Sequence, residues 1–134
     1  MTQEKRIAAS LFLLRLSVFV VMLMWTLDKF VNPGHASQVL ENFFRISGFG
    51  EVAFLIIGGL EMLLILAFVS GSWKRISYGL VLLLHGASTF VSYAQYMDPF
   101  NNLLFFAAWP MLAACITLYL LRDLDSIGVT GFGK

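Results

Sequence analysis

Hydrophobic residues along the chain form four long runs that are separated by short polar segments. The runs cover residues 7–30, 52–69, 76–96 and 103–121. A helix needs about 20 mainly apolar residues to cross the hydrocarbon core of a bilayer, and each run comes close to that length. The first run is too long for the apolar region of a signal peptide, which has about 7 to 15 residues. The pattern therefore predicts an all-α chain, an integral membrane four-helix bundle that forms a single domain over residues 1–134.

The segment between the first two runs has a different pattern. Asn32-Pro33-Gly34 is typical of a turn and ends the first predicted helix. In residues 36–47 apolar side chains recur at helical spacing, and polar side chains occupy the other face. Two interpretations are open: a short amphipathic helix on the membrane surface, or a loop helix that covers one end of the bundle.

Two features modify the C-terminal part of the chain. Pro110 lies within the fourth run and predicts a kink there, because proline removes a backbone donor and crowds the preceding turn. Residues 122–134 form a polar tail that contains glycine, and we expect this tail to be loosely ordered.

Composition supports a membrane location and excludes several classes of function. The chain is 59% apolar and 13% charged, whereas an average soluble domain has about 25% charged residues. The formal net charge of +1 gives no basic surface for nucleic acid. Cys115 is the single cysteine, which excludes an internal disulfide and a cysteine-based metal site made by one chain. With two histidines in addition, we expect no metal site, and we expect Cys115 to be a packing residue.

The distribution of lysine and arginine predicts the orientation of the bundle. Cytoplasmic loops of membrane proteins carry an excess of these residues. One side of the predicted bundle has Lys29 and Arg45, and the other has six basic residues: Lys5, Arg6, Lys74, Arg75, Arg122 and Lys134. We therefore expect both termini to be cytoplasmic, in a bacterial inner membrane.

Arg15, Glu61 and His85 lie well inside the predicted spans, away from their ends. A charged side chain at the centre of a spanning helix costs about 2.5 to 3.5 kcal/mol, so its presence requires a partner or a role. If each run starts at the membrane edge, the helical rise of about 1.5 Å per residue places all three near the midplane. We therefore expect an ion pair between Arg15 and Glu61 inside the bundle, with His85 close enough to join it.

Further polar residues extend this predicted cluster toward the outer surface. On the third predicted helix His85 shares one face with Ser88, Thr89, Ser92 and Tyr96, and Asp28 and Lys29 lie at the outer end of the first helix. In a structural interpretation the charges join helices and the hydroxyls bond to carbonyls of their own helix. In a functional interpretation the layer is a ligand, quinone or proton site, since imidazole titrates near neutral pH. A third interpretation is a polar patch that docks another membrane subunit.

Short motifs between Leu14 and Arg75 give the chain a family resemblance, which covers roughly residues 14–121. They are Leu14-Arg15-Leu16, Trp25, Asp28-Lys29-Phe30, Asn32-Pro33, Gly58-Gly59-Leu60-Glu61, Gly71 and Lys74-Arg75. With these motifs the chain resembles the DoxX family of small four-helix membrane proteins, although Thr26 and Leu27 stand where a glycine is common before the lysine. The resemblance implies a four-helix bundle with both termini inside. It also implies that the arginine, glutamate and lysine of the family correspond to Arg15, Glu61 and Lys29.

The resemblance and the polar layer together suggest a function, although a fold does not determine one. The leading hypothesis is an accessory or quinone-facing subunit of a membrane redox complex, without catalytic residues of its own and with His85 as the proton-active group. We expect no intrinsic cofactor, a quinone or lipid in or beside the bundle, and the bilayer and other membrane subunits as partners. Two alternatives stay open: an assembly or scaffolding factor for other membrane proteins, and a small proton-coupled carrier.

Overall fold

The computed structural model of the protein describes residues 1–48 and 50–129, and all regular secondary structure in that part of the chain is helical. The prediction of an all-α chain is therefore confirmed. The α-helices are α1 (Gln3–Val31), α2 (Pro33–Phe44), α3 (Glu51–Ser70), α4 (Lys74–Val91), α5 (Tyr93–Tyr96) and α6 (Ala108–Leu120). Three short 3-10 helices follow α5 or α6: η1 (Pro99–Asn101), η2 (Leu103–Ala107) and η3 (Arg122–Leu124).

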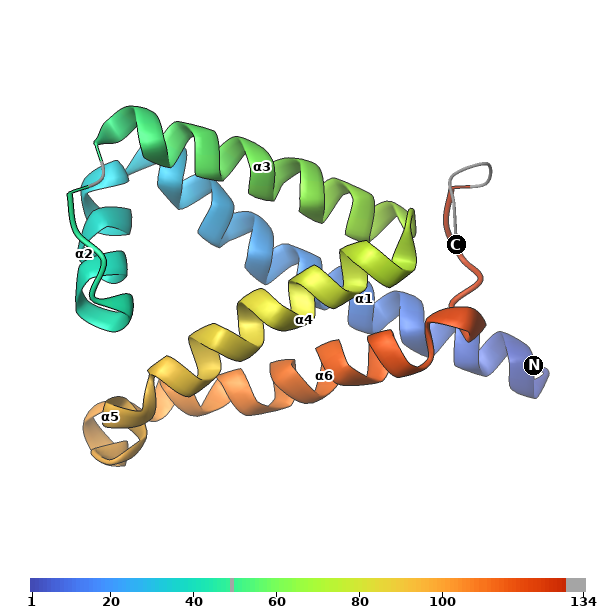
Figure 1. Cartoon of the computed structure of the whole chain (residues 1–134). Coiled ribbons are helices and arrows are strands. Elements are labelled where there is room, and N and C mark those ends of the chain that lie inside the picture. Colours follow the sequence, from blue (N-terminus) through green and yellow to red (C-terminus); the bar gives the residue numbers. More distant parts are fainter. Residues whose placement is uncertain (49, 130–134) are drawn as a thin grey trace.

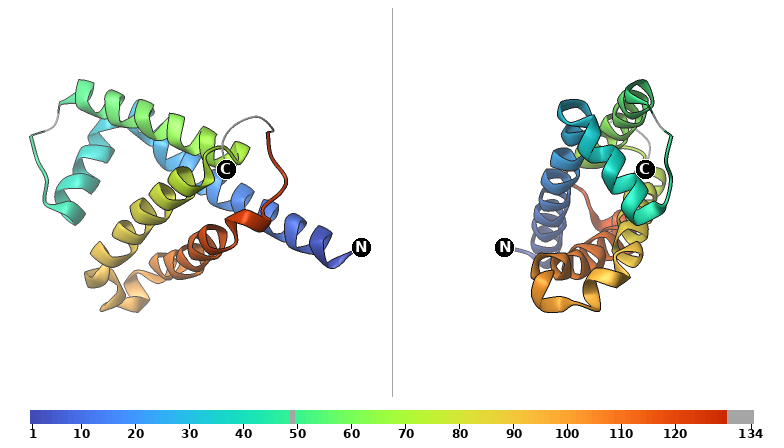
Figure 2. Two further views of the ribbon diagram at one scale, coloured as in Figure 1. Left: turned by 45° about the vertical axis from the view of Figure 1, so that its right-hand side comes forward. Right: turned by 90° about the vertical axis from the view of Figure 1, so that its left-hand side faces the viewer.

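The long helices form two antiparallel pairs, α1 with α3 and α4 with α6 (Figure 1). The pairs approach each other at the end of the molecule where the chain begins and where η3 lies, and they diverge toward the end that holds α2 and α5 (Figure 2). Contacts of α3 with α4 and of α1 with α6 join the two pairs. Residues from the start and the end of the chain therefore lie close together.

A compact core joins the four long helices where the pairs approach each other. Each helix contributes two or more buried side chains to it: Leu11 and Val18 from α1, Ile65 and Phe68 from α3, Tyr78 and Val81 from α4, and Cys115 and Leu118 from α6. Cys115 is only 2% exposed, so it is a packing residue. Around this core the outer faces of the same helices expose large apolar side chains, an arrangement suited to contact with lipid.

Among the described residues, three helical segments are long and apolar enough to cross a membrane: Gln3–Val31, Val52–Ser70 and Leu103–Leu120. These segments indicate an integral membrane protein. The predicted run over residues 76–96 is not a single helix, because α4 ends at Val91 and the short α5 follows it. Lys74 and Arg75 also form the start of α4, which makes this helix less apolar than α3 and α6.

The segment after the first helix begins a new helix at once. Asn32 ends α1, and its side chain accepts a hydrogen bond from the backbone N–H of His35. Pro33 is the first residue of α2, a position where its missing N–H costs little. The amphipathic helix therefore covers Pro33–Phe44 instead of residues 36–47. The helix α2 contacts α1, α3 and α4. Its Phe43 also stacks on Phe105, with ring centroids 6.1 Å apart. Helix α2 therefore covers one end of the bundle.

The chain does not kink at Pro110 in the way the sequence suggested. The segment before it, η2, is a 3-10 helix, and α6 begins only at Ala108. Pro110 thus lies in the first turn of α6, where a backbone N–H would have no carbonyl partner within the helix. The missing N–H of proline therefore breaks no hydrogen bond of α6. The irregularity expected within one helix is instead a change from a 3-10 helix to an α-helix.

Candidate functional site

Arg15 is the centre of a buried polar cluster at the end where the helix pairs meet. Its side chain is 1% exposed, and its Nη1 atom lies 2.7 Å from Oδ2 of Asp125, which is 0% exposed. The same Nη1 atom donates a hydrogen bond to the hydroxyl of Tyr78 at 2.9 Å. The Tyr78 hydroxyl in turn donates to Oδ2 of Asp125 at 2.5 Å. Side chains from α1 and α4 thus converge on one carboxylate oxygen.

Backbone contacts hold the segment that carries Asp125. Arg15 also donates, through Nη2, to the carbonyl of Ile127, and Lys74 donates to the carbonyl of Asp125. The backbone N–H of Val129 donates to the carbonyl of Ser70 at 2.9 Å. The expectation of a loosely ordered tail is therefore wrong for residues 122–129, because the tail supplies the counter-ion of a buried arginine. Residues 130–134 lie outside the described residues.

Two glycines allow the tail and the arginine to come this close. Gly71 ends α3 with φ 76°, and a Cβ atom there would lie 3.3 Å from Nη1 of Arg15. At Gly128 a Cβ atom would lie 2.6 Å from the carbonyl oxygen of Ser70. Larger residues at either position would disturb the cluster.

The predicted ion pair between Arg15 and Glu61 is wrong. Oε2 of Glu61 lies 3.0 Å from Nζ of Lys29 and accepts a hydrogen bond from Thr26 at 3.1 Å. Thr26 follows Arg15 by about 16 Å along α1, at 1.5 Å per residue, so the two ion pairs lie at different levels of the bundle. The depth argument failed because α1 and α3 are staggered along their length: Lys29, near the end of α1, lies beside Glu61, and Gly71, at the end of α3, lies beside Arg15.

His85 lies at a third level and contacts neither ion pair. Its Nε2 atom is 2.9 Å from the carbonyl oxygen of Ala108 and 3.2 Å from the hydroxyl of Thr89. Tyr78, in the arginine cluster, precedes His85 on α4 by about 10 Å of helical rise. Because a carbonyl only accepts, the contact with Ala108 requires a proton on Nε2. The imidazole thus joins α4 to the start of α6.

The hydroxyls that follow His85 bond within their own helix. Ser88 donates to the carbonyl of Leu84 at 3.1 Å, Thr89 to that of His85 at 2.8 Å, and Ser92 to that of Ser88 at 2.9 Å. This is the bonding expected of structural hydroxyls in apolar helices. Tyr96 lies in α5, and its ring packs against those of Phe106 and Trp109.

The far end of α1 is tied to two neighbouring helices by its charged residues. Lys29 reaches α3 through Glu61. Oδ2 of Asp28 lies 2.6 Å from Nδ1 of His35, at the start of α2. Both contacts are partly exposed. They join α2 and α3 to the far end of α1.

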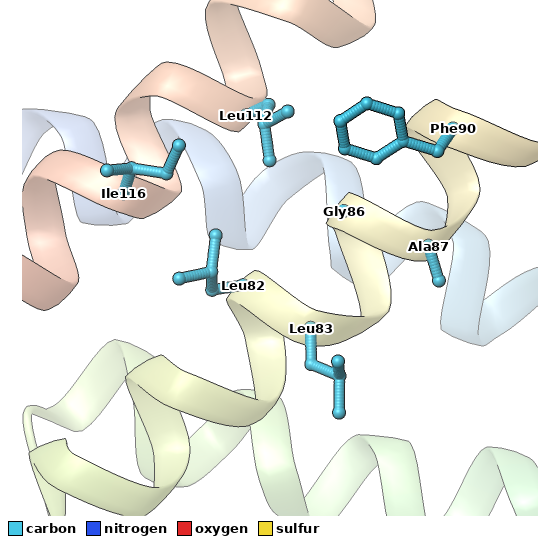
Figure 3. A pocket seen from close by; sticks show the side chains of 7 residues that line it. All are labelled: Leu82, Leu83, Gly86, Ala87, Phe90, Leu112 and Ile116. Atoms are coloured by element: carbon cyan, nitrogen blue, oxygen red, sulfur yellow. The ribbon is translucent and has the colours of Figure 1, made fainter.

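An apolar groove lies on the surface between α4 and α6 (Figure 3). Its volume is about 500 Å³, and it is lined by Leu82, Leu83, Gly86, Ala87, Phe90, Leu112 and Ile116. Phe90 meets the ring of Trp109 edge to face, with centroids 5.8 Å apart, near one end of the groove. The lining is made entirely of apolar residues, so the groove suits an apolar chain and offers no hydrogen bond to a polar group.

Comparison with protein-family models, with curated proteins and with solved structures finds no match for this chain. The resemblance to the DoxX family therefore stays a prediction.

The arrangement is better suited to holding helices together than to catalysis. The charged side chains that are buried among the described residues, Arg15 and Asp125, neutralise each other. Within the same residues, no group of three histidine, cysteine, aspartate or glutamate side chains is placed to hold a metal ion.

Asp125 and Tyr78 are not among the site residues that the sequence predicts. The only signal for Asp125 was that a buried arginine needs an anion.

Proposed function

We propose that this protein is a four-span accessory subunit of a membrane redox complex, of the kind that the DoxX resemblance implies. It supports a partner that carries the redox centre and performs no electron transfer itself. The observation that carries the proposal is the internal pairing of charges: Arg15 with Asp125, and Lys29 with Glu61. Groups that are already paired with one another need no substrate or redox cofactor to neutralise them.

The proposal includes α4 as the fourth crossing, with both termini on the cytoplasmic side. Support comes from the antiparallel pairing of α4 with α6 and from the exposed apolar residues along α4, such as Ile76 and Leu83. Lys74 and Arg75 would then lie at the interface, on the same side as the basic residues that precede the first span. This distribution fits the positive-inside rule.

The proposal assigns the groove between α4 and α6 to the isoprenoid tail of a quinone in the partner complex. A quinone tail is a chain of apolar units, and the groove is apolar, open toward the surface and bordered by aromatic rings. Occupation by a lipid acyl chain is the competing outcome. The quinone head group would bind to the partner, since His85 and the hydroxyls near the groove bond within this chain.

The proposal is tested by isolating the tagged protein from its own host membrane in mild detergent. We expect it to elute in an assembly much larger than 15.0 kDa, with haem or flavin absorbance and extractable quinone following it through the column. Leu83→Trp should fill the groove and lower the quinone content. Leu63→Trp is the matched control, because Leu63 is similarly exposed on α3.

A colourless monomer would contradict the proposal. Equal quinone content in both tryptophan variants, with a lipid retained in the groove, would assign the groove to an acyl chain. If the chain is absent from the mature complex, yet its deletion lowers the amount of that complex, the assembly-factor interpretation is correct.

A further inference from the structure

The arginine cluster has more positive than negative charge among the described residues that form it. Arg15 and Lys74 are cationic, and Asp125 is the single anionic side chain in contact with them. Lys74 bonds to the backbone carbonyl of Asp125 and not to its carboxylate. The tail therefore supplies one negative charge to a site that holds two positive ones, which leaves the site attractive to anions.

The tail also leaves part of the hydrogen-bonding capacity of Arg15 unsatisfied. Nε of Arg15 and Oδ1 of Asp125 are both buried, and neither has a hydrogen-bond partner among the described residues. Arginine binds carboxylate or phosphate most strongly through two parallel N–H···O bonds, but here a single oxygen, Oδ2, accepts from the side chains of both Arg15 and Tyr78. The two anionic oxygens of a phosphodiester can accept from Nη1 and Nη2 of Arg15 together once the carbonyl of Ile127 leaves Nη2, and one of them can also accept from the hydroxyl of Tyr78.

The cluster lies near the end of the bundle, within reach of a lipid headgroup. Gly71, beside Arg15, is the residue that ends α3. Tyr78 is about 6 Å of helical rise beyond Lys74, which is the first residue of α4. Within the described residues, the segment that covers the cluster is residues 122–129, and its regular structure is limited to the three-residue η3 (Figure 1). Residues 125–129 hydrogen-bond to the long helices through the side chains of Arg15, Lys74 and Tyr78 and the carbonyl of Ser70, so their release would leave the hydrogen bonds within those helices in place.

We propose that Arg15, Tyr78 and Lys74 form a binding site for the phosphate of an anionic lipid headgroup, and that Asp125 occupies this site when the lipid is absent. Lipid and tail then compete for one site. Anionic lipids are attracted to basic residues at a membrane surface, so the occupant depends on the composition of the adjacent leaflet. This inference rests on the membrane location in the proposed function, but it does not depend on a redox partner.

The test uses Gly128→Ala, which displaces the tail without changing any charge. The added Cβ would lie 2.6 Å from the carbonyl oxygen of Ser70, so the variant disfavours the docked tail. Gly59→Ala is the matched control, because a Cβ there meets no atom within 4 Å. The full-length proteins are placed in nanodiscs of phosphatidylcholine alone or mixed with phosphatidylglycerol. Hydrogen exchange over residues 122–129 reports the tail, and native mass spectrometry reports retained phosphatidylglycerol.

We expect phosphatidylglycerol to speed exchange of the Val129 N–H in the wild-type protein, because the lipid displaces the tail from Ser70. Gly128→Ala should retain phosphatidylglycerol about tenfold better than wild type, since more of the protein is competent to bind. Tyr78→Phe should weaken retention in the Gly128→Ala background, whereas Tyr93→Phe, at an exposed tyrosine, should not.

Asp125→Asn gives a second test, which can be carried out even if Gly128→Ala fails to fold. If the site binds lipid phosphate, phosphatidylglycerol should restore the melting temperature that this variant loses in phosphatidylcholine. Glu61→Gln, which weakens the other ion pair, should gain no such recovery. A purely structural aspartate predicts the same loss in both lipids.

Three results would overturn the proposal. One is equal retention of phosphatidylglycerol by wild type, Gly128→Ala and Gly59→Ala. Another is tail exchange that does not respond to phosphatidylglycerol, which would make the tail a permanent part of the bundle. The third is release of the tail by inorganic phosphate in pure phosphatidylcholine, which would assign the site to free phosphate and not to a lipid.

Discussion

Nη1 of Arg15 and Oδ2 of Asp125 lie 2.7 Å apart, although one residue belongs to the first helix and the other to the tail after the last helix. Tyr78 of α4 and Gly71 at the end of α3 adjoin the pair. A buried arginine is costly unless its charge is neutralised. The contact therefore joins the end of the chain to α1 and, through the neighbours of the pair, to α3 and α4.

Glu61→Gln should cost about 1 to 2 kcal/mol of stability, because the Lys29–Glu61 pair is partly buried, with each side chain 19% exposed. That value lies between those for exposed pairs and fully buried ones. Thermal unfolding in detergent measures the loss. The charge-swapped protein with Lys29→Glu and Glu61→Lys should recover part of it. A swapped protein no more stable than either single variant would show that the pair does not join α1 to α3.

Gly58→Ala should destabilise the contact between α1 and α3. A Cβ atom at this position would lie 2.9 Å from the ring of Phe30, and overpacking of this kind costs about 1 to 3 kcal/mol. Combining it with Phe30→Leu should relieve the clash and restore the melting temperature. The neighbouring Gly59→Ala is the control and should be neutral, since the space around it is open. Equal effects of the two alanines would contradict the packing seen here.

His85 should carry a proton on Nε2, because Nε2 lies 2.9 Å from the carbonyl oxygen of Ala108. Nitrogen-15 NMR of labelled histidine measures the tautomer directly. His85→Leu should cost about 1 to 3 kcal/mol, since it leaves a part-buried carbonyl without this donor. Observation of the Nδ1-protonated form would show that the histidine does not join α4 to α6.

Phe43→Ala should loosen α2 while leaving α6 unchanged. Phe43 stacks on Phe105, and an aromatic pair contributes about 0.5 to 1.5 kcal/mol beyond the area it buries. Hydrogen exchange should therefore become faster along α2. The adjacent Phe44→Ala is the control, because Phe44 is exposed and should change exchange less. The same exchange rates in both variants would argue that α2 is held by other contacts.

The apolar runs located the long helices well, because burial in lipid requires continuous apolar sequence. Their ends were less accurate. The first run begins at Ile7, yet α1 starts at Gln3, where Thr2 caps the helix by accepting from the backbone N–H of Lys5. Polar residues in a first turn extend a helix without adding to an apolar pattern.

The partners of the buried charges could not be predicted in the same way. Depth along a helix gives distances only if the helices are upright and start at a common plane, and here α1 and α3 are staggered, so that the end of α3 at Gly71 lies beside Arg15. Asp125 also lies in a short polar tail, where no periodicity indicates burial. The sequence therefore favours Glu61 as the partner of Arg15, because Glu61 lies in an apolar run. In the structure the hairpin of α1 and α3 brings Glu61 to Lys29 instead.

A double-mutant cycle on Arg15 and Asp125 tests the central claim most directly, with unfolding free energies measured in one detergent. Arg15→Leu and Asp125→Leu should each cost about 3 to 5 kcal/mol, because each leaves a buried charge without its partner. The double variant should lose much less than the sum. Arg15→Leu combined with Glu61→Leu should be additive within about 0.5 kcal/mol, since these residues share no contact. Additive losses for Arg15 and Asp125, with coupling between Arg15 and Glu61, would contradict the account.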